Sequence, residues 1–106
     1  MVQTIKENFR IMNKFVKNLK ENGIEKILFF GSRLRGDFYP ESDFDILVVS
    51  NKFQKMSKGK RNLFMYQFWK EDIPVDFLCY TLEEFERNVN RATIVNEAVK
   101  KGIEMI

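Results

Sequence analysis

Three short apolar segments constrain the fold of this chain more than any other feature of its sequence. They cover residues 26–30, 43–49 and 75–80, and each has the length and composition of a buried β-strand. In the stretches around them, apolar residues recur at helical spacing. This alternation predicts an α/β fold in which helices flank a sheet of three or four strands.

The N-terminal half carries a clear helix signal. Apolar residues recur at helical spacing over residues 4–21, with lysine, glutamate and asparagine between them, and Gly23 follows as a stop. A second, short helix is expected to begin at Ser32, directly after the first strand. Residues 37–42 combine turn-forming and polar types and are expected to form a loop.

The C-terminal half predicts a further loop and two or three further helices. Residues 50–59 are expected to form a lysine-rich loop, and residues 60–71 a helix with an aromatic face. Thr81 and Glu84 have the spacing of a capping box, which marks the start of one or two more helices. Residues 103–106 follow the last helix as a short strand or a tail.

Histidine is absent from the sequence, and Cys79 is the single cysteine. Histidine acid–base catalysis, Ser-His-Asp and Cys-His mechanisms, and zinc sites built on His or Cys are therefore excluded. A metal bound by this chain would be a hard cation with oxygen ligands, such as Mg²⁺ or Mn²⁺. A lone cysteine forms no internal disulfide, and we expect Cys79 to pack in the sheet.

Length and charge set further bounds. A chain of 106 residues predicts a single domain covering residues 1–106. No segment reads as a membrane span or a signal peptide, so we expect a cytoplasmic protein without membrane contact. The net charge of +3 permits an anionic partner without identifying one. The basic stretch at residues 52–61 is either a solvated loop or a nucleic-acid patch, and both interpretations stay open.

Two aspartates stand at the head of the second apolar segment. Asp43 and Asp45 are two residues apart, so on a strand both side chains point to the same face. Buried carboxylates need a counter-charge, which a divalent cation would supply. The alternative is that both residues start the strand and face solvent. Asp76 is a third acid in an apolar segment, and its alternative is a water-facing position on an edge strand.

A Gly-Ser pair joins the first apolar segment to the short helix. Gly31 would let a phosphate approach the backbone, and the free N–H groups at the helix start would face that anion. Ser32 adds a hydroxyl donor, although a plain serine cap after a glycine turn is the alternative. The coincidence of this pair with three carboxylates favours one shared functional site.

These residues together resemble the signature of the polymerase-beta-type nucleotidyltransferase superfamily. Residues 31–36 read Gly-Ser-Arg-Leu-Arg-Gly, and residues 42–48 read Ser-Asp-Phe-Asp-Ile-Leu-Val. The family pattern is Gly-Ser, ten residues and Asp-x-Asp, and the flanking residues resemble the minimal nucleotidyltransferases in particular. Asp76 matches the family's third carboxylate on a later strand. The resemblance covers about residues 24–84 and implies a small mixed sheet flanked by helices.

The resemblance also implies a reaction. Members transfer a nucleoside monophosphate from a nucleoside triphosphate, by default ATP, to a hydroxyl and release pyrophosphate. Asp43 and Asp45 would hold two Mg²⁺ ions, with Mn²⁺ as the alternative. Asp76 would help to hold the catalytic ion and could accept the proton of the acceptor. Gly31 and Ser32 would grip the β- and γ-phosphates, which fits the physical demands of phosphoryl transfer.

Two arginines in the motif fit a triphosphate, because guanidinium pairs well with phosphate oxygens. We expect Arg33, and less strongly Arg35, to bind phosphate. The alternative for both is solvated helix charge. Two residues apart on a helix, they do not face the same way.

The acceptor is expected to be bound by another chain. Larger relatives carry an added helical domain for this purpose, and the 26 residues after Tyr80 leave no room for one. Minimal nucleotidyltransferases are commonly paired with helical HEPN-type proteins, for which they act as antitoxins, some by placing AMP on the toxin. A second copy of this chain is the other candidate partner.

Three other functions stay open beside this interpretation. The chain could be a non-catalytic module that neutralises a partner by contact, although the complete motif argues against decay. It could modify RNA or a small molecule together with a partner subunit. It could also bind nucleic acid through residues 52–61.

Overall fold

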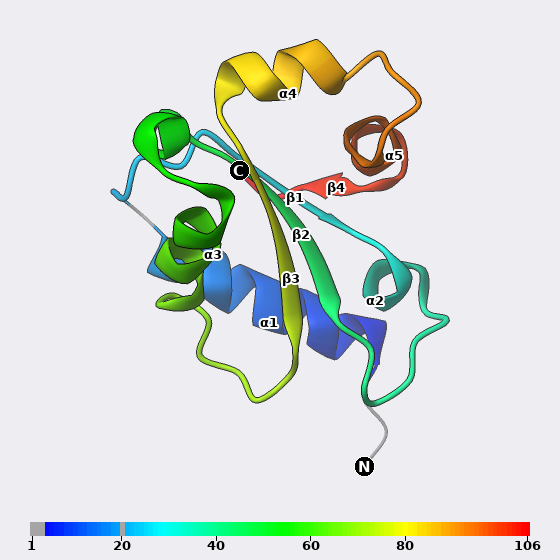
Figure 1. Cartoon of the computed structure of the whole chain (residues 1–106). Helices are drawn as coiled ribbons and strands as arrows, with labels where there is room; N and C mark the ends of the chain where they lie inside the picture. Colours follow the sequence, from blue (N-terminus) through cyan, green and yellow to red (C-terminus); the bar gives the residue numbers. More distant parts are fainter. Residues whose placement is uncertain (1–3, 20) are drawn as a thin grey trace.

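The computed structural model describes residues 4–19 and 21–106, and these residues fold around one mixed sheet. Its strands are β1 (Lys26–Phe30), β2 (Phe44–Val49), β3 (Val75–Tyr80) and β4 (Ile103–Glu104), in the order β3-β2-β1-β4. β1 is antiparallel to both β2 and β4, whereas β2 and β3 are parallel. The predicted α/β class and the small sheet of up to four strands are confirmed (Figure 1).

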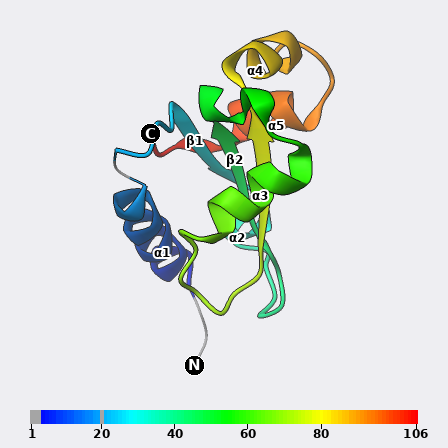
Figure 2. The ribbon, with the colours of Figure 1, turned by 60° about the vertical axis from the view of Figure 1, so that its left-hand side comes forward.

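Helices cover both faces of this sheet (Figures 1 and 2). The helical elements in chain order are α1 (Ile5–Asn18), α2 (Ser32–Arg35), the 3₁₀ turn η1 (Asn51–Lys55), α3 (Lys58–Tyr66), α4 (Leu82–Asn88) and α5 (Ile94–Lys101). α1 lies on one face, and α4 and α5 lie on the other. No helix in the described ranges is long and apolar enough to cross a membrane.

Strand alternation divides the apolar side chains between two cores. Along β2, Ile46 and Val48 pack with residues of α1, whereas Leu47 and Val49 pack with residues of α4 and α5. Cys79 is buried in the first core, as expected. Every strand residue therefore faces either the α1 side or the α5 side of the sheet.

The first helix ends earlier than its apolar pattern predicts. Thr4 caps it by accepting a hydrogen bond from the Glu7 N–H at 3.1 Å. The helix closes at Leu19, and Glu21 has a φ of 69°, a left-handed conformation that helices do not continue through. The predicted end at residue 21 is therefore wrong, and residue 20 lies outside the described ranges.

The middle of the chain also differs from its prediction. The expected loop at 50–59 contains η1, which Ser50 caps by accepting from the Lys52 N–H. The helix expected over 60–71 begins at Lys58 and ends at Tyr66. The chain then turns at residues 67–68, and beyond this turn the Trp69 indole N–H donates to the Ile73 carbonyl at 2.8 Å.

The C-terminal elements follow their sequence signals. Thr81 accepts from the Glu84 N–H at 3.2 Å, and the Glu84 carboxylate accepts from the Thr81 N–H at 2.8 Å. This capping box starts α4, and α5 stops at Gly102. Residues 103–104 form the fourth strand, so the last segment is a strand instead of a tail.

Candidate functional site

The sheet register brings three acids to one end of the molecule. Asp45 pairs with Asp76 across the parallel strands β2 and β3, and on its other side it faces Phe30, the last residue of β1. Asp43 lies directly before β2 and two residues from Asp45, so the two side chains are on the same face of the sheet. All three acids lie where β1 ends and where β2 and β3 begin, on the sheet face that α4 and α5 cover.

The three carboxylates differ in burial. Asp43 and Asp76 are exposed, whereas Asp45 is only partly exposed. Burial, helped by the charges of Asp76, Asp43 and Glu97, raises the pKa of Asp45 to about 6. Arg35 acts in the opposite direction but does not cancel these effects. The result is a concentration of negative charge that a bound cation would relieve.

Gly31 allows the loop after β1 to approach Asp45. Its φ is 85°, and a Cβ atom at this position would lie 2.1 Å from Asp45 Oδ2. Only glycine fits, because any side chain would be strained and would collide with the carboxylate. The turn at Gly31 therefore sets Ser32 and the first turn of α2 beside the acid cluster.

A cavity of about 240 Å³ lies between these groups. It is lined by Phe30, Gly31, Ser32, Arg35, Asp45, Ile94 and Glu97. Four residues that the sequence singles out thus share one cavity, together with two residues of α5. Arg35 is exposed, and its guanidinium donates to both oxygens of Asp37 at 3.1 and 3.4 Å.

Asp76 faces a second space, at the β3 edge of the sheet. It lines a cleft of about 190 Å³ between β3 and α3, together with Lys58 and Asn62. β3 is an edge strand of the described sheet, as one interpretation of Asp76 expects. Asp45 and Asp76 are neighbours in register, so this cleft begins beside the first cavity.

Arg33 does not lie with the other predicted site residues. It is fully buried, and its guanidinium donates to the carbonyl oxygens of Ser42 and Pro40, each at 3.0 Å. It also lies over the rings of Phe38 and Phe44, at 4.6 and 5.2 Å. The expected phosphate contact of Arg33 is therefore corrected to a positioning role: it fixes the loop that leads into the Asp-x-Asp pair.

Two residues of this region escaped prediction. Asn8 is buried in α1, and its amide donates to the Arg33 carbonyl at 3.0 Å, which ties α1 to α2. Glu97 reaches the cavity from α5. Both read as ordinary polar positions of amphipathic helices, because helical periodicity does not indicate which distant segment a helix touches.

The donor set fits a hard divalent cation by its chemistry. All the candidate ligands are carboxylate oxygens, which Mg²⁺ and Mn²⁺ prefer, and the repulsion around Asp45 is what a cation would offset. Within residues 4–19 and 21–106, no three Asp, Glu, His or Cys side chains are placed to ligate one ion. Metal binding would therefore require side-chain adjustment, which the exposure of Asp43 and Asp76 permits.

The basic stretch at residues 52–61 keeps its four lysines exposed but places its arginine in the interior. Arg61 is buried, and it donates to the Met56 and Cys79 carbonyl oxygens, each at 3.1 Å. It also pairs with Glu84 at 2.7 Å, and this hydrogen bond lowers the pKa of Glu84. Arg61 thus joins α3 to β3 and α4 and is removed from any nucleic-acid patch.

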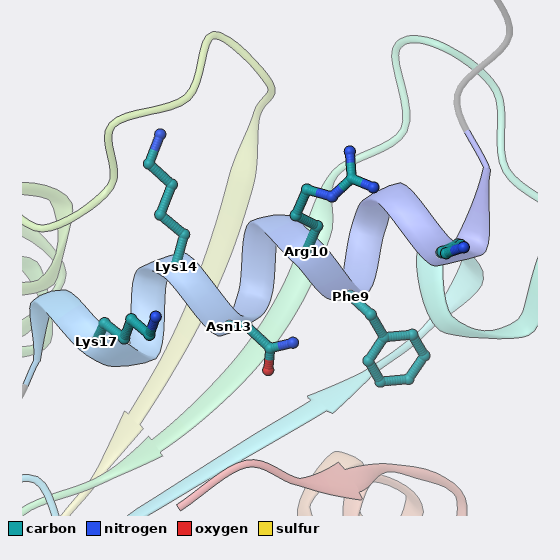
Figure 3. A pocket seen from close by; sticks show the side chains of 6 residues that line it. Phe9, Arg10, Asn13, Lys14 and Lys17 are labelled. Carbon is teal, nitrogen blue, oxygen red and sulfur yellow. The ribbon is translucent and has the colours of Figure 1, made fainter.

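A shallow groove of about 530 Å³ runs along the outer side of α1 (Figure 3). It is lined by Lys6, Phe9, Arg10, Asn13, Lys14 and Lys17. Phe9 points to the sheet, where its ring meets Phe29 edge to face at 5.6 Å. None of the predicted site residues lines this groove, so it is separate from the acid cluster.

Comparison with known proteins identifies the family of this chain. A family model described as a nucleotidyltransferase domain matches residues 12–101. The chain therefore belongs to the nucleotidyltransferase domain family, whose members typically use divalent metals. No curated protein matches the chain.

A solved structure agrees with the family. A protein from Sulfolobus solfataricus assigned as a nucleotidyltransferase is 25% identical to this chain, with a TM-score of 0.60. The match covers 82% of each chain. A second structure with the same assignment is 26% identical over 78% of this chain and 84% of that chain; its TM-score of 0.41 is too low to support the fold.

Proposed function

We propose that this chain transfers a nucleoside monophosphate, AMP from ATP, to an acceptor hydroxyl and releases pyrophosphate. The observation that carries the proposal is the shared cavity of Gly31, Ser32 and Asp45, with Asp76 in register beside it. A phosphate-accessible turn and carboxylates at one sheet end are the two components that nucleotidyl transfer requires.

The proposed roles follow from position. Asp43, Asp45 and Asp76 would hold two Mg²⁺ ions, which would supply charge neutralisation of the triphosphate. Gly31 and Ser32 would bind the β- and γ-phosphates through the loop backbone and the hydroxyl, with Arg35 at the rim.

Asp76 is the proposed proton acceptor because it is exposed and lines the neighbouring cleft. The acceptor oxygen would form a bond to the α-phosphorus as the bond from that phosphorus to the β-bridging oxygen breaks. The hydroxyl proton would pass to the Asp76 carboxylate, and pyrophosphate would leave with the bonding electron pair.

We further propose that the acceptor is a side chain of a HEPN-type helical protein, with this chain as its antitoxin. The support is the resemblance of residues 31–36 and 42–48 to minimal nucleotidyltransferases and the open cleft beside Asp76. Modification of RNA or a small molecule, and contact without catalysis, are the competing functions.

The test uses ATP labelled at the α-phosphate, Mg²⁺ and an extract of the source cells. An Asp43→Asn/Asp45→Asn double variant is the inactive comparison, and Asp72→Asn, an exposed acid outside both cavities, is the matched control. Label in a protein band with the unaltered chain and the control alone supports protein adenylylation. Label in RNA or a small molecule would replace that acceptor, and no label from folded protein would contradict catalysis.

A further inference from the structure

Glu97 is a fourth carboxylate at the candidate site, supplied by a helix that the sequence motif does not include. In α5, Val95 and Ala98 are buried against the sheet. Ile94 and Glu97 lie beyond this packed face and line the same cavity as Gly31, Ser32 and Asp45. The helix therefore places an acid opposite the turn at which a polyphosphate is expected.

The charge of this cavity is unfavourable for a bare polyphosphate. Among its lining residues, Asp45 and Glu97 are acidic and Arg35 alone is basic. Arg35 is already paired with Asp37. Lys101 lies 3.9 Å from Glu97, but both side chains are about half exposed or more, so this pair is weak.

We propose that Glu97 is a specificity-determining residue that favours binding of the nucleotide as its divalent-metal complex over binding of the free nucleotide. This inference rests on the proposed function. A triphosphate without metal carries several negative charges and is repelled by Glu97, whereas its metal complex has lost much of that charge. Glu97 therefore lowers the affinity for the free nucleotide more than the affinity for the complexed one.

The experiment measures binding instead of turnover. We would titrate the purified chain with a fluorescent ATP analogue whose α,β-bridge is methylene, so that no transfer occurs, in Mg²⁺ and in EDTA. Glu97→Gln keeps the side-chain size, and Glu97→Lys reverses the charge. Glu83→Gln is the matched control, because Glu83 is exposed in α4 and pairs with Arg87 at 3.9 Å in the same i, i+4 manner.

The ratio of the dissociation constant in EDTA to that in Mg²⁺ is the diagnostic quantity. For Glu97→Gln it should fall about three- to tenfold, mainly through tighter binding in EDTA, and the effect should shrink as salt is added. Glu97→Lys should lower the ratio further, and Glu83→Gln should leave it unchanged.

Two other outcomes separate this inference from the proposed function. If the unaltered chain binds the analogue in Mg²⁺ but Glu97→Gln and Glu97→Lys leave the ratio unchanged, the role of Glu97 is refuted and nucleotide binding stands. If the folded, unaltered chain binds the analogue in neither buffer, both proposals are refuted.

Discussion

Asp45→Asn should stabilise the folded chain at neutral pH while removing the proposed activity. The substitution keeps the shape of the side chain and removes its charge. The charge is unfavourable where it lies, because burial and the carboxylates of Asp76 and Asp43 raise the pKa of Asp45 from 3.8 to about 6. The folded state therefore binds a proton at this site more readily than the unfolded state does.

The direction of the pH dependence follows from this difference. Below about pH 4 the aspartate is protonated in both states, and its replacement changes little. Between about pH 4 and 6 the folded state keeps its proton while the unfolded state loses it, so stability falls as the pH rises. The full shift corresponds to roughly 3 kcal/mol, which solvent screening of this partly exposed group reduces to about 1–1.5 kcal/mol.

Thermal unfolding at low salt, followed by circular dichroism at pH 4 and pH 8, measures the effect. At pH 8, Asp45→Asn should melt higher by about 4–8 °C for each kcal/mol gained, and at pH 4, close to the unfolded value of 3.8, the difference should shrink to a small fraction of that gain. Asp72→Asn should match the unaltered chain at both values. Saturating Mg²⁺ at pH 8 should stabilise the unaltered chain more than the variant.

A variant that melts lower at pH 8, or that gains equally at both pH values, would refute the electrostatic reasoning. An equal gain would mean that the amide improves packing or hydrogen bonding independently of charge. Stabilisation together with full transferase activity would refute the assignment of Asp45 to the site, since the proposed chemistry requires its carboxylate.

Four further substitutions test contacts that hold the site and the fold. Gly31→Ala should lower stability by about 1–3 kcal/mol in urea unfolding and abolish nucleotide binding, since its φ is 85° and its Cβ would meet Asp45; unchanged binding would show that the turn has another role. Arg33→Met should lower stability by about 2–4 kcal/mol and make the 37–43 loop sensitive to protease, because it unpairs the loop carbonyls; a stable, protease-resistant variant would contradict the clamp. Arg61→Met should lower the free energy of unfolding in urea by about 2–4 kcal/mol, because it leaves Glu84 and two backbone carbonyls without their partner. Glu84→Gln, which keeps one hydrogen-bond acceptor, should cost less than Arg61→Met, and the reverse order would assign the main role to the carboxylate.

Local features of the sequence predict the strands well. The segments 26–30 and 75–80 are bounded as expected, because Gly31 ends the first apolar run and Pro74 and Thr81 flank the second. The sequence alone also predicts that Asp43 and Asp45 lie on the same face of the sheet. Helix ends are less well predicted, since the apolar pattern of residues 60–71 continues past Tyr66, where α3 ends.

Long-range placement limits what could be predicted about the site. An arginine beside a Gly-Ser motif has the chemistry of a phosphate ligand, and only the fold reveals that Phe38 and Phe44 enclose Arg33. Glu97 is distant from the motif in sequence and meets it because α5 packs on β1 and β2 residues. In both cases the decisive information is which segments come together, which periodicity does not contain.

The strand alternation that builds the two cores also places the residues that hold the site and the acids of the site on opposite faces of the sheet. On the α1 side, Phe44 and Arg33 hold the loop before β2, and this side is apolar beneath them. On the α5 side, the same strand presents Asp45 between β1 and β3, where neighbouring strands fix its position. Asp43 and Asp76 flank it and remain exposed, whereas Asp45 is partly buried. The acid that the fold buries most is thus the one whose charge is unfavourable without a cation, so under the proposed function folding and metal binding would be coupled through this single side chain.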